Sequence, residues 1–198
     1  MKNDVGRSPW FVLSLALFFL FSCASEQKKQ TEVKDPRFYN NRGVANGKKG
    51  QYDQAISDFS KAIELSPAYQ KAYNNRGTIF GRMGQYDRAI ADFNKALEID
   101  SMVAETYNNL AWLYATAKAP DFLNGKKAVE LARKACDLSD WKDPNTLDTL
   151  AAAYARAGDF ENAVKWQEKA LEASDSARRS ELQKRLNLYR ERKPWPDG

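Results

Sequence analysis

Tyr39-Asn40-Asn41-Arg42-Gly43 returns 34 residues later as Tyr73-Asn74-Asn75-Arg76-Gly77, and this duplicated stretch decides the fold. Residues 50–53 (GQYD) return at the same offset as residues 84–87. A fixed period of this length indicates supersecondary units stacked side by side. Arrays of this kind usually hold other molecules along a surface that each unit rebuilds.

Each unit is predicted to be a pair of short helices. Tyr39 and Gly43, and then Ala55 and Phe59, recur at helical spacing, and Gly50 separates the two runs as a helix-ending glycine. Asp53, Asp87 and Glu161 begin the second helices, where a negative charge suits the helix dipole. The chain is therefore expected to be all-α.

The later units vary this pattern. Ala111 and Ala128 are seventeen positions apart where Gly43 and Ala55 are twelve apart, so a five-residue insertion is expected around residues 118–125. A last helix over about residues 176–193 carries Leu182, Leu186 and Tyr189 on one face, which would cover the open end of the stack. Its basic residues are interpreted as a solvated face, with an anionic partner as the alternative.

The duplicated motifs closely resemble the tetratricopeptide repeat, over residues 36–173. The resemblance divides the array at about 36–69, 70–103, 104–143 and 144–173, with a capping helix and tail at 174–198. It implies a right-handed α-solenoid of about four helix hairpins. The expected function is that of a membrane-tethered interaction module, a scaffold or an assembly factor. A protein or peptide segment is the expected partner, held in a groove lined by the first helices.

Residues 1–22 have the pattern of a signal peptide, with Lys2 and Arg7 ahead of a short apolar run. Leu20, Ser22 and Cys23 resemble the lipobox of bacterial lipoproteins, which implies acylation of Cys23 and a flexible tether over 23–35. Cleavage after Ala24 remains the alternative. The resemblance predicts export and lipid anchoring to a bacterial envelope membrane facing the periplasm. Ala24 favours the outer membrane, because aspartate retains some lipoproteins at the inner one.

Paired asparagines recur on the first helices, and an amide can pair with a peptide backbone without reading its sequence. The family's asparagine ladder matches Asn41, Asn75 and Asn109, and the alternative is that these are hydrated groove residues left by duplication. One subgroup of the family uses lysines to bind the C-terminal carboxylate of a peptide. This chain has Asn40 and Glu105 at the positions of those lysines, so binding of a C-terminal carboxylate is not predicted. The predicted partner-binding set is Asn40, Asn41, Asn74, Asn75, Asn108, Asn109, Arg37, Lys48, Lys71, Thr78, Arg82, Trp112 and Arg156.

Composition excludes several kinds of chemistry. The 198 residues contain no histidine and two cysteines, which excludes histidine-dependent catalysis and a cysteine metal cluster. No catalytic, metal-binding or cofactor-binding residue is predicted, and Cys136 is expected to be a buried thiol. A hydrolase built on paired carboxylates is disfavoured because Asp58 and Asp92 recur at the repeat offset, which is interpreted as a solvated face. A net charge of +5 is too small to favour an RNA-binding repeat protein, and no nucleic acid is expected.

Overall fold

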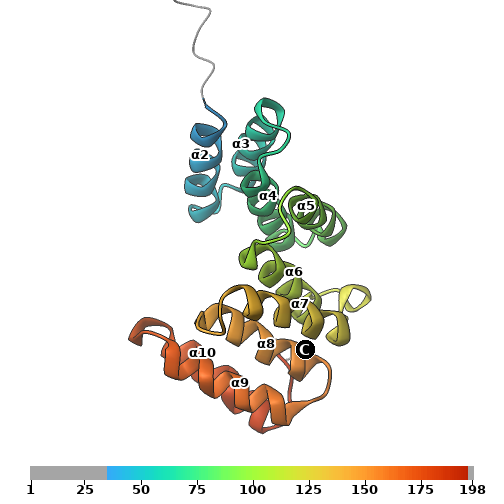
Figure 1. Ribbon diagram of the computed structural model, residues 1–198, viewed down its shortest axis with the longest axis vertical. Helices are drawn as coiled ribbons and strands as arrows, with labels where there is room; N and C mark the ends of the chain where they lie inside the picture. Colours follow the sequence, from blue (N-terminus) through green and yellow to red (C-terminus); the bar gives the residue numbers. More distant parts are fainter. Residues whose placement is uncertain (1–34, 196–198) are drawn as a thin grey trace, which may run out of the picture. The chain divides into compact units, whose positions relative to one another are not determined.

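The computed structural model describes residues 35–195, and all the regular structure in this range is helical. The helices follow one another as antiparallel hairpins from α2 to α9, and α10 packs against α9 (Figure 1). Their bounds are α2 Pro36–Lys48, α3 Tyr52–Leu65, α4 Gln70–Arg82, α5 Tyr86–Ile99, α6 Ala104–Thr116, η1 (a 3₁₀ turn) Pro120–Phe122, α7 Gly125–Leu138, α8 Pro144–Arg156, α9 Phe160–Ala173 and α10 Ser176–Arg190. The all-α prediction is confirmed.

Glycine ends the first helix of three of the four hairpins. Gly50, Gly84 and Gly158 have φ angles of 77°, 75° and 84°, a left-handed conformation that side-chain-bearing residues rarely adopt. The third hairpin has no such glycine, because the insertion leads from α6 through η1 to α7. The periodic glycines therefore set where each helix reverses into the next.

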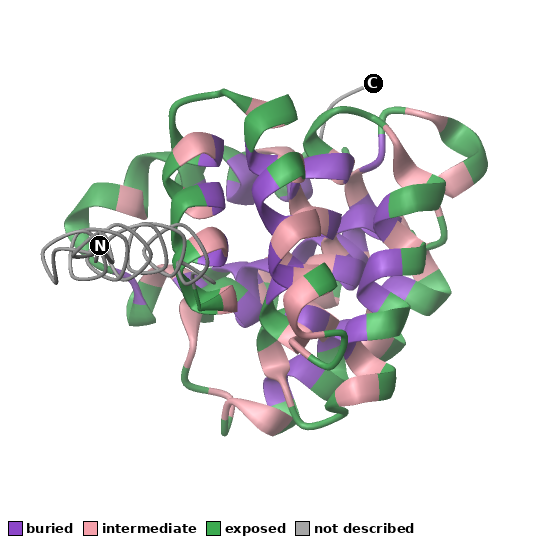
Figure 2. Ribbon diagram, turned by 90° about the horizontal axis from the view of Figure 1, so that it is seen from above, coloured by how far each residue is buried: buried purple, intermediate pink, exposed green. Residues whose placement is uncertain are grey.

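Small residues on the second helices let neighbouring helices approach closely. Ala55, Ala89, Ala128 and Ala163 occupy equivalent positions, and each is fully buried. Buried residues accordingly lie on the sides of the helices that face each other, and exposed residues lie on the outer sides and in the turns (Figure 2). The core thus runs along the stack between the helices.

The first two hairpins carry an internal ion pair. Asp58 accepts hydrogen bonds from Arg42, and Asp92 accepts them from Arg76, whose Nε lies 2.8 Å from the carboxylate. The interpretation of Asp58 and Asp92 as solvated is therefore wrong, because they are 5% and 7% exposed. The hydrogen bond to Asp92 raises the pKa of Arg76 above its ordinary value.

The last two hairpins replace this ion pair by apolar residues. The position of Arg42 is taken by Leu110 and then by Leu150, both of which belong to the main hydrophobic core. The partner position is taken by Leu131 and Trp166, which pack against the same core. The hairpins therefore share a backbone arrangement but differ in the side-chain contacts that hold their two helices together, which are ion pairs in the first two hairpins and apolar contacts in the last two.

Helix α10 covers the end of the array through both apolar and charged contacts. Leu182, Leu186 and Tyr189 are buried as predicted, and burial raises the pKa of Tyr189. Arg185 is also buried and pairs with Asp148 of α8 at 2.5 Å, so the prediction of a wholly solvated basic face is wrong for this residue. The helix ends at Arg190 rather than at 193, and Arg192 turns the chain with a φ angle of 59°.

Within residues 35–195, no helix combines the length and hydrophobicity that a bilayer span requires. Cys23 and the predicted signal peptide lie outside the described residues.

Candidate partner-binding pocket between the second and third hairpins

The paired asparagines connect neighbouring hairpins to one another. Asn75 donates from Nδ2 to Oδ1 of Asn40 at 2.9 Å, and Asn109 donates to Oδ1 of Asn74 at 3.1 Å. Asn40 and Asn74 are only 5% and 2% exposed. Both amides are enclosed between hairpins and accept a hydrogen bond from the next repeat, and their role in partner binding stays a prediction.

This connection ends at the third hairpin. The residue equivalent to Asn75 and Asn109 in the fourth hairpin is Thr149, which lacks an amide. Oδ1 of Asn108, at the position of Asn40 and Asn74, is consequently buried without a hydrogen-bond partner. Asp148, which follows it in the series, instead accepts from Gln167 of α9 at 3.0 Å and from Arg185.

A pocket of about 570 Å³ opens between α4 and α6. We call it the α4–α6 pocket. Its volume falls in the range of roughly 300–1,000 Å³ that small-ligand sites occupy, and it is several times the cavity of about 150 Å³ that holds a benzene ring. It is lined by Thr78, Gly81, Arg82, Met83, Gly84, Tyr86, Phe93, Asn109, Trp112, Leu113, Thr116, Ala117 and Lys118.

The pocket exists because one contact of the first hairpin boundary is missing at the second. A methyl group built on Gly47 would lie 2.9 Å from Cδ1 of Ile79, so Ile79 fills the space over that glycine. Gly81 is the equivalent glycine, and Leu113 is the equivalent of Ile79. A methyl group on Gly81 would meet only Cβ of Ala89, at 4.0 Å, so Leu113 leaves the space open.

The insertion of the third hairpin packs beside this opening. The backbone N–H of Lys118 donates to the hydroxyl of Tyr86 at 3.0 Å, and the ring of Phe122 lies 5.1 Å from the ring of Tyr86. Asn124 donates its backbone N–H to the carbonyl oxygen of Tyr114 at 2.9 Å. These contacts fix the chain between α6 and α7 against α5, where it supplies Ala117 and Lys118 to the pocket.

The charge at the pocket is of one sign. Of the described residues that line it, Arg82 and Lys118 carry a charge, and both are exposed. Among residues 35–195, neither side chain forms an ion pair. The lining otherwise combines apolar and aromatic side chains with the hydroxyl and amide groups of Thr78, Asn109 and Thr116.

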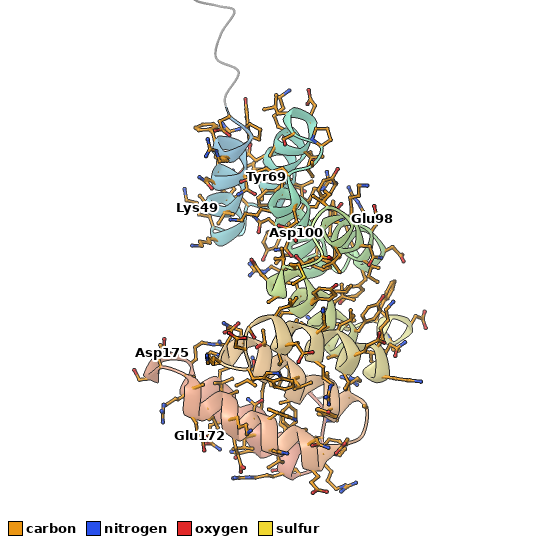
Figure 3. All side chains as sticks on the ribbon, in the orientation of Figure 1. Lys49, Tyr69, Glu98, Asp100, Glu172 and Asp175 are labelled. Carbon is orange, nitrogen blue, oxygen red and sulfur yellow. The ribbon has the colours of Figure 1, made fainter. Side chains whose placement is uncertain are left out.

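Four predicted partner-binding residues meet at this pocket, namely Thr78, Arg82, Asn109 and Trp112. The others do not line it: Arg37 pairs with Asp35 at 2.6 Å, and Asn41, Lys48 and Lys71 are exposed elsewhere on the first helices. Figure 3 shows the side chains that project between neighbouring helices, with Tyr69 labelled just before α4 and Asp100 labelled just after α5. Sequence reasoning missed Met83, Tyr86, Leu113 and Lys118.

Arg156 is committed to packing at the C-terminal end. Its Nε donates to the carbonyl oxygen of Ala115 at 2.7 Å, and Nη2 donates to that of Trp195 at 3.3 Å. Burial lowers the pKa of Arg156 from its ordinary value. The guanidinium therefore links α6, α8 and the C-terminal segment, and a role of Arg156 in partner binding stays a prediction.

Trp112 has a second neighbour besides the pocket. The guanidinium carbon of Arg185 lies 5.1 Å from the centroid of Trp112 and 5.3 Å from that of Trp195. This stacking holds the Trp112 ring from the α10 side. The pocket wall is thereby tied to the C-terminal cap.

The residues described are those of 35–195, and within this range no three acidic or cysteine side chains gather as a metal-binding group. Asp58 forms an ion pair with Arg42, and Asp92 forms one with Arg76. The α4–α6 pocket itself combines an open volume with apolar, hydroxyl, amide and cationic lining groups, which are features of a binding site.

Comparison with known proteins agrees with this architecture. Models of the tetratricopeptide repeat match residues 36–69 and 71–102, and a further tetratricopeptide repeat model matches residues 145–174. No curated protein gives a significant match to the sequence.

Several solved structures share the fold. PilF of Pseudomonas aeruginosa is 19% identical, with 79% of this chain and 69% of that chain covered and a TM-score of 0.68. PilW, described as a widely conserved type IV pilus biogenesis factor, is 18% identical, with coverages of 82% and 76% and a TM-score of 0.64. MamA is 19% identical, with coverages of 79% and 81% and a TM-score of 0.61. At these identities the likeness establishes the fold, and the matched models show that the chain carries tetratricopeptide repeats at residues 36–69, 71–102 and 145–174.

Proposed function

We propose that this chain is a membrane-tethered interaction module, a scaffold or assembly factor that holds a segment of a partner protein in the α4–α6 pocket. The observation that carries the proposal is the open space over Gly81 at the second hairpin boundary. At the first boundary, Ile79 fills the equivalent space over Gly47. A preformed pocket binds without the cost of opening a packed boundary.

The groups around the pocket suit a peptide. Asn109 donates from Nδ2 to Asn74 and to Thr78, and within the described part of the chain no hydrogen bond uses its Oδ1. That oxygen can accept a backbone N–H of a bound segment while the apolar lining takes a side chain. Of the three asparagines matched to the family ladder, Asn109 lines the pocket, so we assign it the main contact.

Photo-crosslinking in cells tests this proposal. A photoreactive amino acid at position 82, at the pocket, is expected to crosslink a partner protein. The same residue at position 134, exposed on α7, serves as the control. Equal crosslinking at the two positions, or none at position 82, would contradict the assignment of the pocket.

Filling the pocket provides a second test. Gly81→Leu places a side chain in the open space without a clash at its Cβ, so the fold is expected to persist while crosslinking from position 118 is lost. Unchanged helical content by circular dichroism, with unchanged crosslinking, would show that the pocket is not the binding site.

The tether is the part of the proposal that rests on sequence alone. Acylation of Cys23 would hold the chain at an envelope membrane facing the periplasm, an address in line with an assembly role such as the pilus biogenesis named for PilW. The change Cys23→Ser is expected to move the protein from the membrane fraction to the soluble fraction. Retention of the variant in the membrane pellet would refute lipid anchoring.

A further inference from the structure

Resting on the proposed function, we infer that the α4–α6 pocket selects an acidic partner segment, one that places a large apolar side chain between carboxylates. Two independent properties of the pocket lead to this class of partner. One is the apolar volume that the missing contact over Gly81 creates, and the other is the sign of the charge beside it.

The apolar part of the site needs a bulky side chain. Phe93 and Leu113 are buried at 2% and 6% exposure and provide deep apolar surface. Met83, at 37% exposure, and the ring of Trp112 provide more. An aromatic or large aliphatic side chain would recover this surface from water, whereas glycine or a short polar side chain would leave it wet.

The charged part of the site needs carboxylates. Arg82 lies in the last turn of α4, and Lys118 lies in the insertion. Two separate elements therefore place a positive charge at the opening of the pocket. The acids nearest along the chain, Asp87 and Asp121, do not line the pocket. Since no lining acid neutralises the two cations, carboxylates beside the anchoring side chain would meet both.

The insertion makes this preference specific to the second boundary. Lys118 is held by its backbone N–H on the Tyr86 hydroxyl, so its position depends on the five added residues of the third hairpin. The first boundary has neither the open space nor an equivalent inserted cation, because Ile79 covers Gly47. One acidic segment per chain is therefore expected to bind.

The experiment uses the purified full chain in detergent micelles and three fluorescein-labelled glycine–serine peptides. The first carries one phenylalanine flanked by pairs of glutamates, the second replaces the glutamates by lysines, and the third replaces the phenylalanine by glycine. Fluorescence anisotropy is expected to show saturable binding of the first peptide. The second and third are expected to bind at least about tenfold more weakly, because each lacks one of the two required contacts.

Reversing the charges of the pocket in the protein tests the same preference for carboxylates from the protein side. The double variant Arg82→Glu, Lys118→Glu is expected to bind the glutamate peptide about tenfold more weakly and to gain affinity for the lysine peptide. Lys134→Glu together with Lys184→Glu, at exposed positions on α7 and α10 that do not line the pocket, makes the same change in net charge and is expected to leave both affinities unchanged.

Equal binding of the glutamate and lysine peptides, or equal loss in the control variant, would overturn the inference. Binding of the glycine peptide as tight as that of the phenylalanine peptide would also overturn it, since the apolar pocket would then be unused. Any of these results combined with partner crosslinking at position 82 would refute the inferred class of segment, which is acidic with an apolar anchor, while leaving the proposed function in place.

Discussion

Asn109 donates a hydrogen bond to Asn74 across the boundary between the second and third hairpins, with 3.1 Å between Nδ2 and Oδ1. The same bond joins Asn75 to Asn40 one boundary earlier. In each pair the acceptor asparagine is nearly inaccessible, and the donor contacts the preceding hairpin; the donor Asn109 also lines the pocket. The paired-asparagine motif therefore contributes first to the stacking of the repeats.

Removing one member of this connection should reduce stability. Asn74→Ala leaves Nδ2 of Asn109 with only the longer contact of 3.4 Å to the hydroxyl of Thr78, and it is expected to lower the free energy of unfolding by about 1–3 kcal/mol. Asn108→Ala is the matched control, because Oδ1 of Asn108 has no partner, and its loss is expected to stay below about 1 kcal/mol. Urea unfolding followed by circular dichroism measures both, and equal losses would show that the inter-hairpin bond contributes nothing.

The two ion pairs of the first hairpins should differ in importance. Arg76→Met leaves the buried carboxylate of Asp92 unpaired, and we expect it to lower the free energy of unfolding by about 2–3 kcal/mol. Arg42→Met is expected to lower the free energy of unfolding less than Arg76→Met does, because Arg42 is half exposed and Asn46 still donates to Asp58 at 3.0 Å. The ranking is checked by denaturant titration of the two variants, and a larger loss for Arg42→Met would contradict it.

Two glycines should respond to alanine in opposite directions. A methyl group on Gly125 would lie 2.6 Å from the backbone nitrogen of Ala157, so Gly125→Ala is expected to destabilise the protein by about 1–3 kcal/mol or more. At Gly81 the methyl group meets only Cβ of Ala89 at 4.0 Å, and Gly81→Ala is expected to stabilise α4 by about 0.5–1 kcal/mol. Thermal unfolding of both variants gives the signs, and destabilisation by Gly81→Ala would show that the space over this glycine is not open.

Cys136 should be unreactive in the folded protein. It is fully buried, as the sequence predicted, and burial raises the pKa of its thiol to about 11, the nearby Thr146 acting in the opposite direction. At pH 8 roughly a thousandth of the thiol is then ionised, so alkylation by iodoacetamide is expected to be at least about a hundredfold slower than in urea. Mass spectrometry resolved by peptide separates Cys136 from Cys23, and equal rates in the two conditions would contradict the burial.

The raised pKa also fixes the direction of a pH effect. The unfolded thiol loses its proton near pH 9, before the folded one does, so this group lowers the free energy of unfolding as the pH rises from about 9 towards 11. Below the unfolded pKa the contribution is constant. Cys136→Ala is expected to remove this part of the alkaline destabilisation, which denaturant titrations across that pH window would measure.

Most of the architecture could be predicted because its signals are local. The duplicated stretch at Tyr39 and Tyr73, the turn glycines and the small residues of the second helices each act within one hairpin. The position of the basic capping helix could be predicted, but the prediction that its basic residues are solvated is wrong for Arg185. The partner of Arg185, Asp148, lies on a different helix. Pairing of charges between distant elements leaves no periodic trace in the sequence.

The sequence by itself determined that this chain forms stacked helical hairpins, and it placed Thr78, Arg82, Asn109 and Trp112 on the helices that carry the pocket. Only the tertiary structure decided which groove residues remain accessible and where a cavity opens. The reason is steric: Ile79 and Leu113 are equivalent in the repeat, yet only Ile79 reaches the glycine opposite it. That difference depends on how closely adjacent hairpins pack, which no single repeat encodes.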